Sequence, residues 1–168
     1  MTTDTAGGTG NLAIGNYALD ALTSGDYNTA VGLSALGANT TAGSNVAIGA
    51  SALEFNTTGA SNTAVGTSSL DANTTGDNLT AVGLGALGAN TTADNNTAVG
   101  RSALTANTTG TANVAVGKDA GKLVTTGSYN TFIGTYAGQS SPTTSANRIA
   151  LGYNVAPVGD AYFTFGEG

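Results

Sequence analysis

The sequence predicts an all-β protein, a β-solenoid (parallel β-roll) with one coil for each unit of an internal repeat. Two observations carry this prediction: an exact seventeen-residue repeat and a glycine at one fixed position of every repeat unit. Three neighbouring units, "TAVGTSSLDANTTGDNL" (63–79), "TAVGLGALGANTTADNN" (80–96) and "TAVGRSALTANTTGTAN" (97–113), follow one another without a gap. Spacing this regular is typical of a repeat architecture, in which each unit is one structural element.

The repeat sets the domain boundaries. If Leu12 is position one, eight units run to Asn147 without insertion. Position four is always glycine: Gly15, Gly32, Gly49, Gly66, Gly83, Gly100, Gly117 and Gly134. Position seventeen is Asn28, Asn45, Asn62, Asn96, Asn113, Asn130 and Asn147, with Leu79 as the exception. We therefore expect an N-terminal lead (1–11), a solenoid (12–152) of eight coils plus a final partial coil, and a C-terminal cap or exit segment (153–168).

Each unit is too short for a helical repeat. It does not hold two helices and a turn, and a helix in "SALGAN" would meet Gly, Asn and β-branched Thr after about one turn. The remaining solution is one β-coil per unit. We expect "NTAVG" to form a strand that ends in a glycine bend, "ALxA" a second short strand, and "NTTG" the return turn. Eight such coils, about 4.8 Å apart, would make a rod of roughly 38 Å.

Large aliphatic residues recur at two positions and predict the core. We expect the side chains of positions three and eight to point into the coil and to stack from coil to coil. Because side chains alternate along a strand, position one (Leu12, Thr29, Val46 and their equivalents) would also point inward. The predicted core ladder is Val31, Ile48, Val65, Val82, Val99, Val116 and Ile133 at position three, with Leu36, Leu53, Leu70, Leu87 and Leu104 at position eight.

Position two would then point outward, and it is small and apolar in almost every unit. A coil that buries one Val or Ile and one Leu, each worth about 2 kcal/mol, has a thin core. Ordering the chain costs on the order of 1–1.5 kcal/mol per residue, so burial against partner chains would add needed stability. We expect this column to be a trimer interface: Ala30, Ala47, Ala64, Ala81, Ala98, Ala115 and Phe132.

The return turns carry Asn at position eleven and Thr at positions twelve and thirteen. We expect an internal turn ladder whose Asn side chains bond the backbone: Asn39, Asn56, Asn73, Asn90 and Asn107. The alternative is an ice-binding surface made by the Thr ladders. In that alternative two Thr columns should point the same way, whereas the two Thr of "NTT" are adjacent and should point to opposite sides.

Composition excludes most chemistry. The chain has no Cys and no His, its net charge is −6, and no Lys or Arg precedes Arg101, so we expect no nucleic-acid partner. Apolar runs are too short to insert into a membrane. Asp77 and Asp94, one coil apart, are a weak carboxylate pair for a glycosidase or for Ca²⁺, and "GKDAGK" lacks the spacing of a phosphate loop. We expect no enzyme, no metal and no cofactor.

The C-terminal segment breaks the pattern. "RIALGYNVAPVGDAYFTFGEG" begins like one more coil and then collects Tyr162, Phe163 and Phe165. A solenoid needs its last coil covered, so we expect a cap. The alternative is an aromatic contact with a sugar or with a following protein segment.

The repeat resembles known fibre proteins. "SNVAIGASAL" (44–53) is similar to the "NSVAIG"-type head repeats of trimeric autotransporter adhesins, and "NTAVGxxALxxNTTG" together with "NRIALGYNV" (147–155) resembles the repeats of phage tail fibres. The resemblance covers nearly the whole chain. It implies a homotrimer of left-handed parallel β-rolls that serves as a shaft or receptor-contacting head. The repeat unit of this chain is longer than the usual adhesin unit.

The expected function is therefore structural and adhesive. We expect a rigid trimeric rod in a phage tail fibre (virion) or a bacterial adhesin (cell surface, extracellular) that attaches to a host or surface through a glycan or protein receptor. Two alternatives remain at this stage. One is an ice-binding β-solenoid, and the other is a subunit of a self-assembling extracellular filament.

Overall fold

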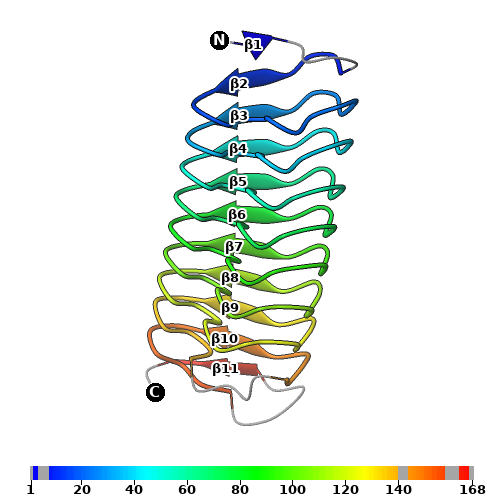
Figure 1. Ribbon diagram of the computed structural model, residues 1–168. Coiled ribbons are helices and arrows are strands. Elements are labelled where there is room, and N and C mark those ends of the chain that lie inside the picture. The colour runs from blue at the N-terminus through cyan, green and yellow to red at the C-terminus, as the bar shows by residue number, and fades with distance from the viewer. Residues whose placement is uncertain (1, 4–7, 140–143, 158–162, 167–168) are drawn as a thin grey trace.

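The strands of all coils lie side by side along one wall of the molecule (Figure 1). The computed structural model describes residues 2–3, 8–139, 144–157 and 163–166, so Tyr162 of the expected cap lies outside the described residues. The strands are β1 (Thr2–Thr3), β2 (Leu12–Ile14), β3 (Thr29–Val31), β4 (Val46–Ile48), β5 (Thr63–Val65), β6 (Thr80–Val82), β7 (Thr97–Val99), β8 (Val114–Val116), β9 (Thr131–Ile133), β10 (Ile149–Leu151) and β11 (Phe163–Phe165). They form one sheet in chain order, parallel from β2 to β11, with β1 antiparallel to β2. The predicted β-solenoid is confirmed.

From β2 to β9 each residue pairs with its equivalent in the next repeat unit, as between Thr63 and Thr80. The second short strand that we expected in "ALxA" is not formed, because this segment makes turns in every coil that the structure describes. Cross-coil hydrogen bonds continue there nonetheless: Leu36 N donates to Ala52 O (3.0 Å) and Leu53 N to Ser69 O (3.0 Å). Each coil is thus held to the next along its whole path, with a single short strand.

The prediction of an uninterrupted repeat is wrong at the eighth coil. Ile149 pairs with Thr131, so this coil is longer than the preceding ones by a single residue. The extra residue lies between Gln139 and Ser145, because the hydrogen bond from Gln139 N to Tyr136 O still follows the repeat, whereas Asn130 Nδ2 bonds Ser145 O. As a result Arg148, and not Asn147, occupies position seventeen.

Glycine at position four is required by the closeness of the coils. Gly83 has φ of 135°, and a Cβ there would lie 2.6 Å from the carbonyl carbon of Gly100 in the next coil. Side chains do not tolerate that separation, so the bend can stack only if every coil carries glycine there.

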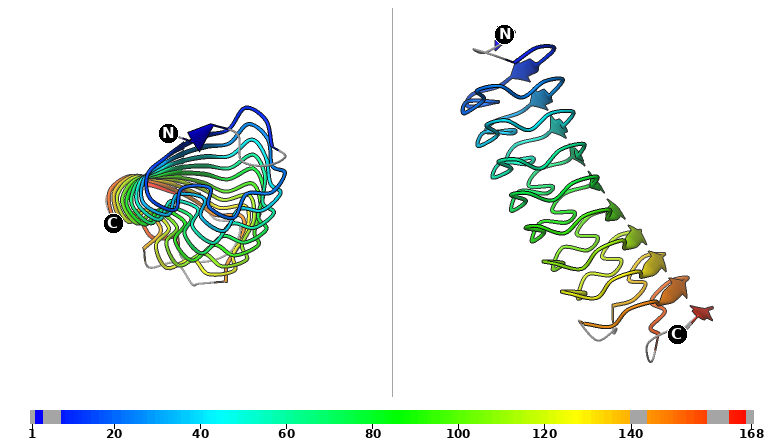
Figure 2. Two further views of the ribbon diagram at one scale, coloured as in Figure 1. Left: turned by 45° about the horizontal axis from the view of Figure 1, so that its top comes forward. Right: turned by 90° about the vertical axis from the view of Figure 1, so that its right-hand side faces the viewer.

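Successive coils are turned slightly about the long axis, and the strands stay on one side of the rod (Figure 2).

Each coil is closed by turns that contain residues with positive φ angles, in the left-handed region of backbone conformation. Leu36, Leu53, Leu70, Leu87 and Leu104 at position eight have φ between 50° and 53°, and positions six and sixteen are also positive in most coils. Each such residue costs roughly 1–2 kcal/mol relative to an ordinary conformation. These leucines are fully buried, which is worth about 2 kcal/mol each, so packing holds the strained turn in place.

Inside the coil, position two faces positions seven and eight. The side chains of Ala30, Ala47, Ala64, Ala81, Ala98 and Ala115 are 0% exposed within this single chain. Phe132 is the one large residue in this column, and the leucine position beside it is glycine both in its own coil (Gly138) and in the preceding coil (Gly121). A Cβ at Gly121 would lie 2.7 Å from the Phe132 ring, and one at Gly138 would overlap the same ring. The ring therefore fills the volume that leucine fills elsewhere.

The presence of glycine in place of leucine beside Phe132 predicts how a second aromatic residue in the Ala column would change the free energy of unfolding. Ala81→Phe alone should strongly destabilise the protein, because the ring overlaps Leu70 and Leu87 in a close-packed interior. Adding Leu70→Gly and Leu87→Gly should restore part of the loss, since glycine also relieves the positive φ there. Urea unfolding of the single and triple variants checks this. A triple variant less stable than the single one would contradict the proposed packing.

Leucine truncation provides the companion prediction. Leu87→Ala removes most of a fully buried side chain in the middle of the stack and should cost about 2–5 kcal/mol of unfolding free energy. The measurement is again the urea midpoint and slope. The control is Asp94→Asn in an outward turn, which should shift the unfolding free energy by less than about 0.5 kcal/mol.

Candidate binding face on the strand side of the coil

Positions one and three of each strand point away from the core, opposite to our prediction. The exposed fractions at position three include 44% at Ile14, 41% at Ile48, 36% at Val99, 37% at Val116 and 43% at Ile133. Val31, Val65 and Val82 are half-buried. Position one, mostly Thr with some Val, Leu and Ile, is half-buried or exposed in the same way. The strands therefore present two parallel outward columns of mostly β-branched side chains.

The predicted core ladder is thus right for its leucines and wrong for its position-three members, Val31, Ile48, Val65, Val82, Val99, Val116 and Ile133. The predicted trimer interface is wrong for the same reason. The Ala column and Phe132 are closed off inside one chain and are not available to another. The physical cause is space: the interior behind the strand is so narrow that it admits Ala, and the bulkier residue of each alternating pair must face outward.

The outward columns form a regular and largely apolar strip, with Val, Ile or Leu at position three and mostly Thr at position one. Neighbouring strands lie about 4.8 Å apart, so strands β2 to β10 extend over roughly 40 Å, and the length of one strand is about 10 Å. The strip then covers on the order of 400 Å², which is within the size range of the largest apolar patch on a typical single soluble protein.

The Thr columns of the return turns do not make a second such surface. Position-twelve hydroxyls bond the next coil, as Thr57 Oγ1 donates to Thr74 O (3.0 Å) and Thr74 Oγ1 to Thr91 O (3.0 Å). The position-thirteen residues Thr58, Thr75 and Thr92 are exposed. One Thr of each pair therefore serves the stack and only the other faces outward.

The turn ladder of Asn side chains is confirmed. Asn39, Asn56, Asn73, Asn90 and Asn107 are fully buried. Asn73 Nδ2 donates to Asn56 Oδ1 (2.8 Å) and to Gly76 O (3.1 Å), and Asn90 Nδ2 donates to Asn73 Oδ1 (3.0 Å). The ladder ends where Val124 replaces Asn, and Asn107 Oδ1 has no hydrogen-bond partner among the described residues.

A second internal ladder, at position seventeen, was not predicted, although its Asn residues were visible in the sequence. Asn62 N donates to Asn45 Oδ1 (2.9 Å), and Asn62 Nδ2 donates to Gly76 O (2.8 Å). The same pattern ends at Arg148, whose N donates to Asn130 Oδ1 (3.1 Å) and whose side chain is fully buried. For both ladders the signal in the sequence was an Asn residue that recurs every seventeen residues at the same position of the repeat.

Several of the described charged residues bond to other parts of the chain. Asp94 Oδ1 accepts from Asp77 N (2.8 Å), and Asp77 Oδ1 accepts from Ala60 N (2.6 Å), so this pair of carboxylates bonds neighbouring turns. Asp119 is buried and pairs with Arg101 (3.4 Å) and Lys122 (3.2 Å).

Burial raises the pKa of Asp71 above its ordinary value, and the charge of Glu54 adds to this rise, against backbone hydrogen bonds that lower it.

Within the described part of the chain, no three His, Cys, Asp or Glu residues lie close enough together to hold a metal ion. The same residues include no helix long and apolar enough to cross a membrane. Comparison of the chain with protein-family models, with curated proteins and with solved structures gives no match.

Placing an acidic residue in the turn Asn ladder should make the free energy of unfolding depend on pH. Asn73→Asp removes both donated hydrogen bonds and places a carboxylate against Asn56 Oδ1 and Gly76 O, which should cost about 3 kcal/mol or more at pH 7. Desolvation raises the pKa of this new carboxyl above its unfolded value of about 3.9. The deficit should therefore be smallest below that value and grow as the pH rises towards the folded-state pKa.

Urea unfolding of this variant and of the unsubstituted chain, at pH 4 and pH 7, measures the difference. Asp94→Asn, in the outward turn, is the control and should change little at pH 7. If Asn73→Asp were equally mild at pH 7, the ladder would not be buried in solution.

Proposed function

We propose that this chain is a rigid segment of an extracellular fibre, a phage tail fibre or a bacterial adhesin, in which three copies pack through their strand faces. The observation that carries the proposal is the apolar strip of positions one and three, which a single chain leaves exposed or half-buried from β2 to β10. Cross-coil bonds make each chain a stiff rod. The similarity of the repeats to those of trimeric adhesins and tail fibres supports the number of copies.

Strip-to-strip packing would stabilise a thin-cored rod. The interior of one chain holds Ala and Leu in most coils, and the larger Val and Ile side chains remain half-buried or exposed. Their burial against partner chains contributes roughly 25 cal/mol for each Å² of apolar surface removed from water. The strips on three rods have equal length and the same slight turn from coil to coil, so they can run alongside one another, and the turns of each rod remain free to meet a receptor.

The native mass tests this proposal. Light scattering should give three times the chain mass of 16.2 kDa. Replacing Val65, Val82 and Val99 with Lys should dissociate the particle, because unpaired ammonium groups are strongly disfavoured in a buried interface. Lys at Thr58, Thr75 and Thr92, which are exposed turn residues, is the matched control and should leave the mass unchanged. Retention of the native mass by the Val variant would contradict the proposed interface.

Ice binding is the second candidate, and a specific observation favours it on this face. Thr63, Thr80 and Thr97 stand beside Val65, Val82 and Val99 on the same side of consecutive strands. The two columns are about 7 Å apart and repeat about every 4.8 Å, which makes a regular array that turns slightly about the rod axis. We therefore assign this second candidate to the strand face, in place of the turn Thr ladders that the sequence suggested.

The two functions give opposite results. A monomeric native mass together with thermal hysteresis in cooled solution would select ice binding, provided that the Val65, Val82 and Val99 to Lys variant loses the hysteresis. A trimeric mass without hysteresis supports the fibre, because the strip is then covered by other copies.

A further inference from the structure

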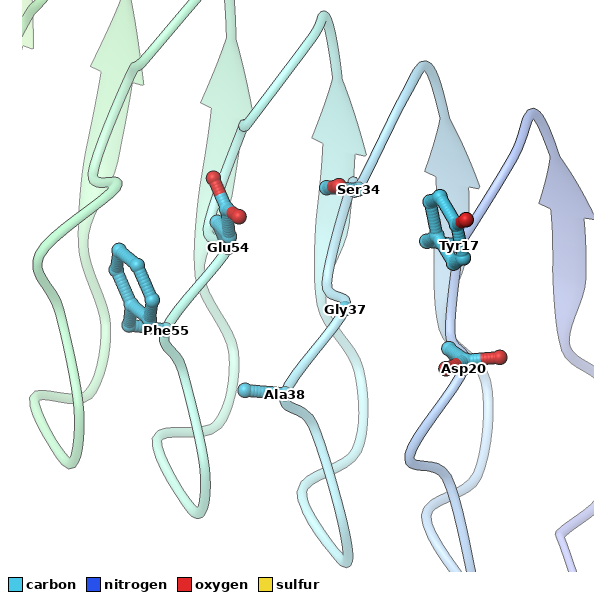
Figure 3. A pocket seen from close by; sticks show the side chains of 7 residues that line it. All are labelled: Tyr17, Asp20, Ser34, Gly37, Ala38, Glu54 and Phe55. Atoms are coloured by element: carbon cyan, nitrogen blue, oxygen red, sulfur yellow. The ribbon is translucent and has the colours of Figure 1, made fainter.

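A hollow of about 240 Å³ interrupts the surface of the first three coils, on the segment that follows the glycine bend (Figure 3). Its walls are two aromatic side chains, Tyr17 and Phe55, and two carboxylates, Asp20 and Glu54. Ser34, Gly37 and Ala38 of the coil between them make its floor. In Figure 3 the aromatic rings lie at opposite corners, and the carboxylates lie at the other two.

The hollow arises from departures from the repeat. Position six is Ser in four coils, but it is Tyr17 in the first. Position ten is Ala in five coils, but it is Phe55 in the third. The coil between them carries Gly37 at position nine, where both neighbouring coils have a carboxylate. A coil with small side chains thus lies between two coils with large ones.

Stacking does not require these residues. Tyr17 is 66% exposed and Phe55 is 55% exposed, so neither ring is held in place by the core. Large exposed aromatic side chains at positions where the same backbone accepts Ser or Ala gain little from the fold. Their placement around one hollow points to a ligand.

The charge around the hollow favours a cation. Residues 1–100 include seven acidic and no basic side chains, so Asp20 and Glu54 have no Lys or Arg within that part of the chain. Asp71, one coil beyond Glu54, adds to the negative potential. Aromatic faces attract cations through their quadrupole, by about 0.5–1 kcal/mol at exposed sites and more where water is excluded. Carboxylates and ring faces together are the chemistry that recognises an ammonium group.

A related contact between a tyrosine and an ammonium group lies near the other end of the chain. Tyr136 occupies position six, as Tyr17 does, and Lys118 Nζ lies 5.1 Å from the centre of its ring. The same ammonium donates to Tyr136 Oη (3.0 Å). No lysine precedes Tyr17 in the sequence. A tyrosine in this column therefore contacts a lysine ammonium of the chain in the eighth coil, and no lysine of the chain precedes Tyr17 to make the same contact.

We propose that the hollow between Tyr17 and Phe55 binds an organic ammonium group, with Asp20 and Glu54 as counter-charges. The group can come from a quaternary ammonium such as choline or from a primary amine such as a polyamine. The hollow lies away from the strand strip, so this site does not depend on the fibre proposal and remains open if the strips pack together.

Isothermal titration calorimetry with choline, spermidine and two uncharged probes tests the proposal. Dimethylbutanol has the shape of choline without its charge, and N-acetylglucosamine is a neutral sugar. Choline or spermidine should bind, more weakly as salt screens the carboxylates, and both uncharged probes should bind at least 5-fold more weakly. Preference between choline and spermidine identifies the source of the ammonium.

The variants return each aromatic position to a residue that the other coils carry, so the fold is preserved. Tyr17→Ser, Phe55→Ala and the charge-removing Glu54→Gln should each weaken binding about 5-fold or more. Tyr129→Ser and Asp94→Asn are the matched controls, an exposed ring and a turn carboxylate outside the hollow, and should leave affinity unchanged. Equal binding of choline and dimethylbutanol, binding of the sugar alone, or no binding at all would each overturn the proposal.

Discussion

Hydrogen bonding between successive coils is the constraint on which the rest of this structure depends. Each coil must lie within one strand spacing, about 4.8 Å, of its neighbour along its entire path. At the bend this spacing leaves no room for a side chain, because a Cβ at Gly83 would collide with the carbonyl group of Gly100. Polar side chains inside the coil must bond along the same axis, which the two Asn ladders achieve from coil to coil. Repetition of the sequence is the direct consequence, since a residue that fits one coil fits all of them.

The period, the fold class, the buried leucines and the turn Asn ladder could be predicted because each depends on the repeat itself. The inner side of the strand could not be assigned by hydrophobicity, since Ala and Val are both apolar and alternate. Size decides: the interior admits Ala, and Val and Ile face outward. The sequence did contain this information, because Phe132 enters the Ala column where Gly121 and Gly138 replace leucine. Positions that face each other across the interior are therefore identified better by changes in residue size that compensate one another than by residue polarity.

Other features needed the path of the chain. The lengthened eighth coil changes which residue enters position seventeen, and the fully buried Arg148 follows from that insertion. The hollow joins Tyr17 at position six to Phe55 at position ten, two coils away. Their proximity depends on how the chain turns through left-handed residues between these positions, including Leu36 at φ of 52°. Residue spacing alone does not contain that geometry.

The division between inward and outward columns explains where such a protein can vary. An inward residue is tied to the residues packed around it, so Phe132 requires glycine at position eight both of its own coil and of the preceding coil. An outward residue at positions five, six, nine or ten has no such requirement, and Ser, Gly and Tyr all occupy position six on the same backbone. A single small coil between two larger ones then creates a hollow without any change in fold. Recognition on a rod of this kind is therefore expected at the positions where the repeat fails, while the stiffness of the rod depends on the positions where it holds.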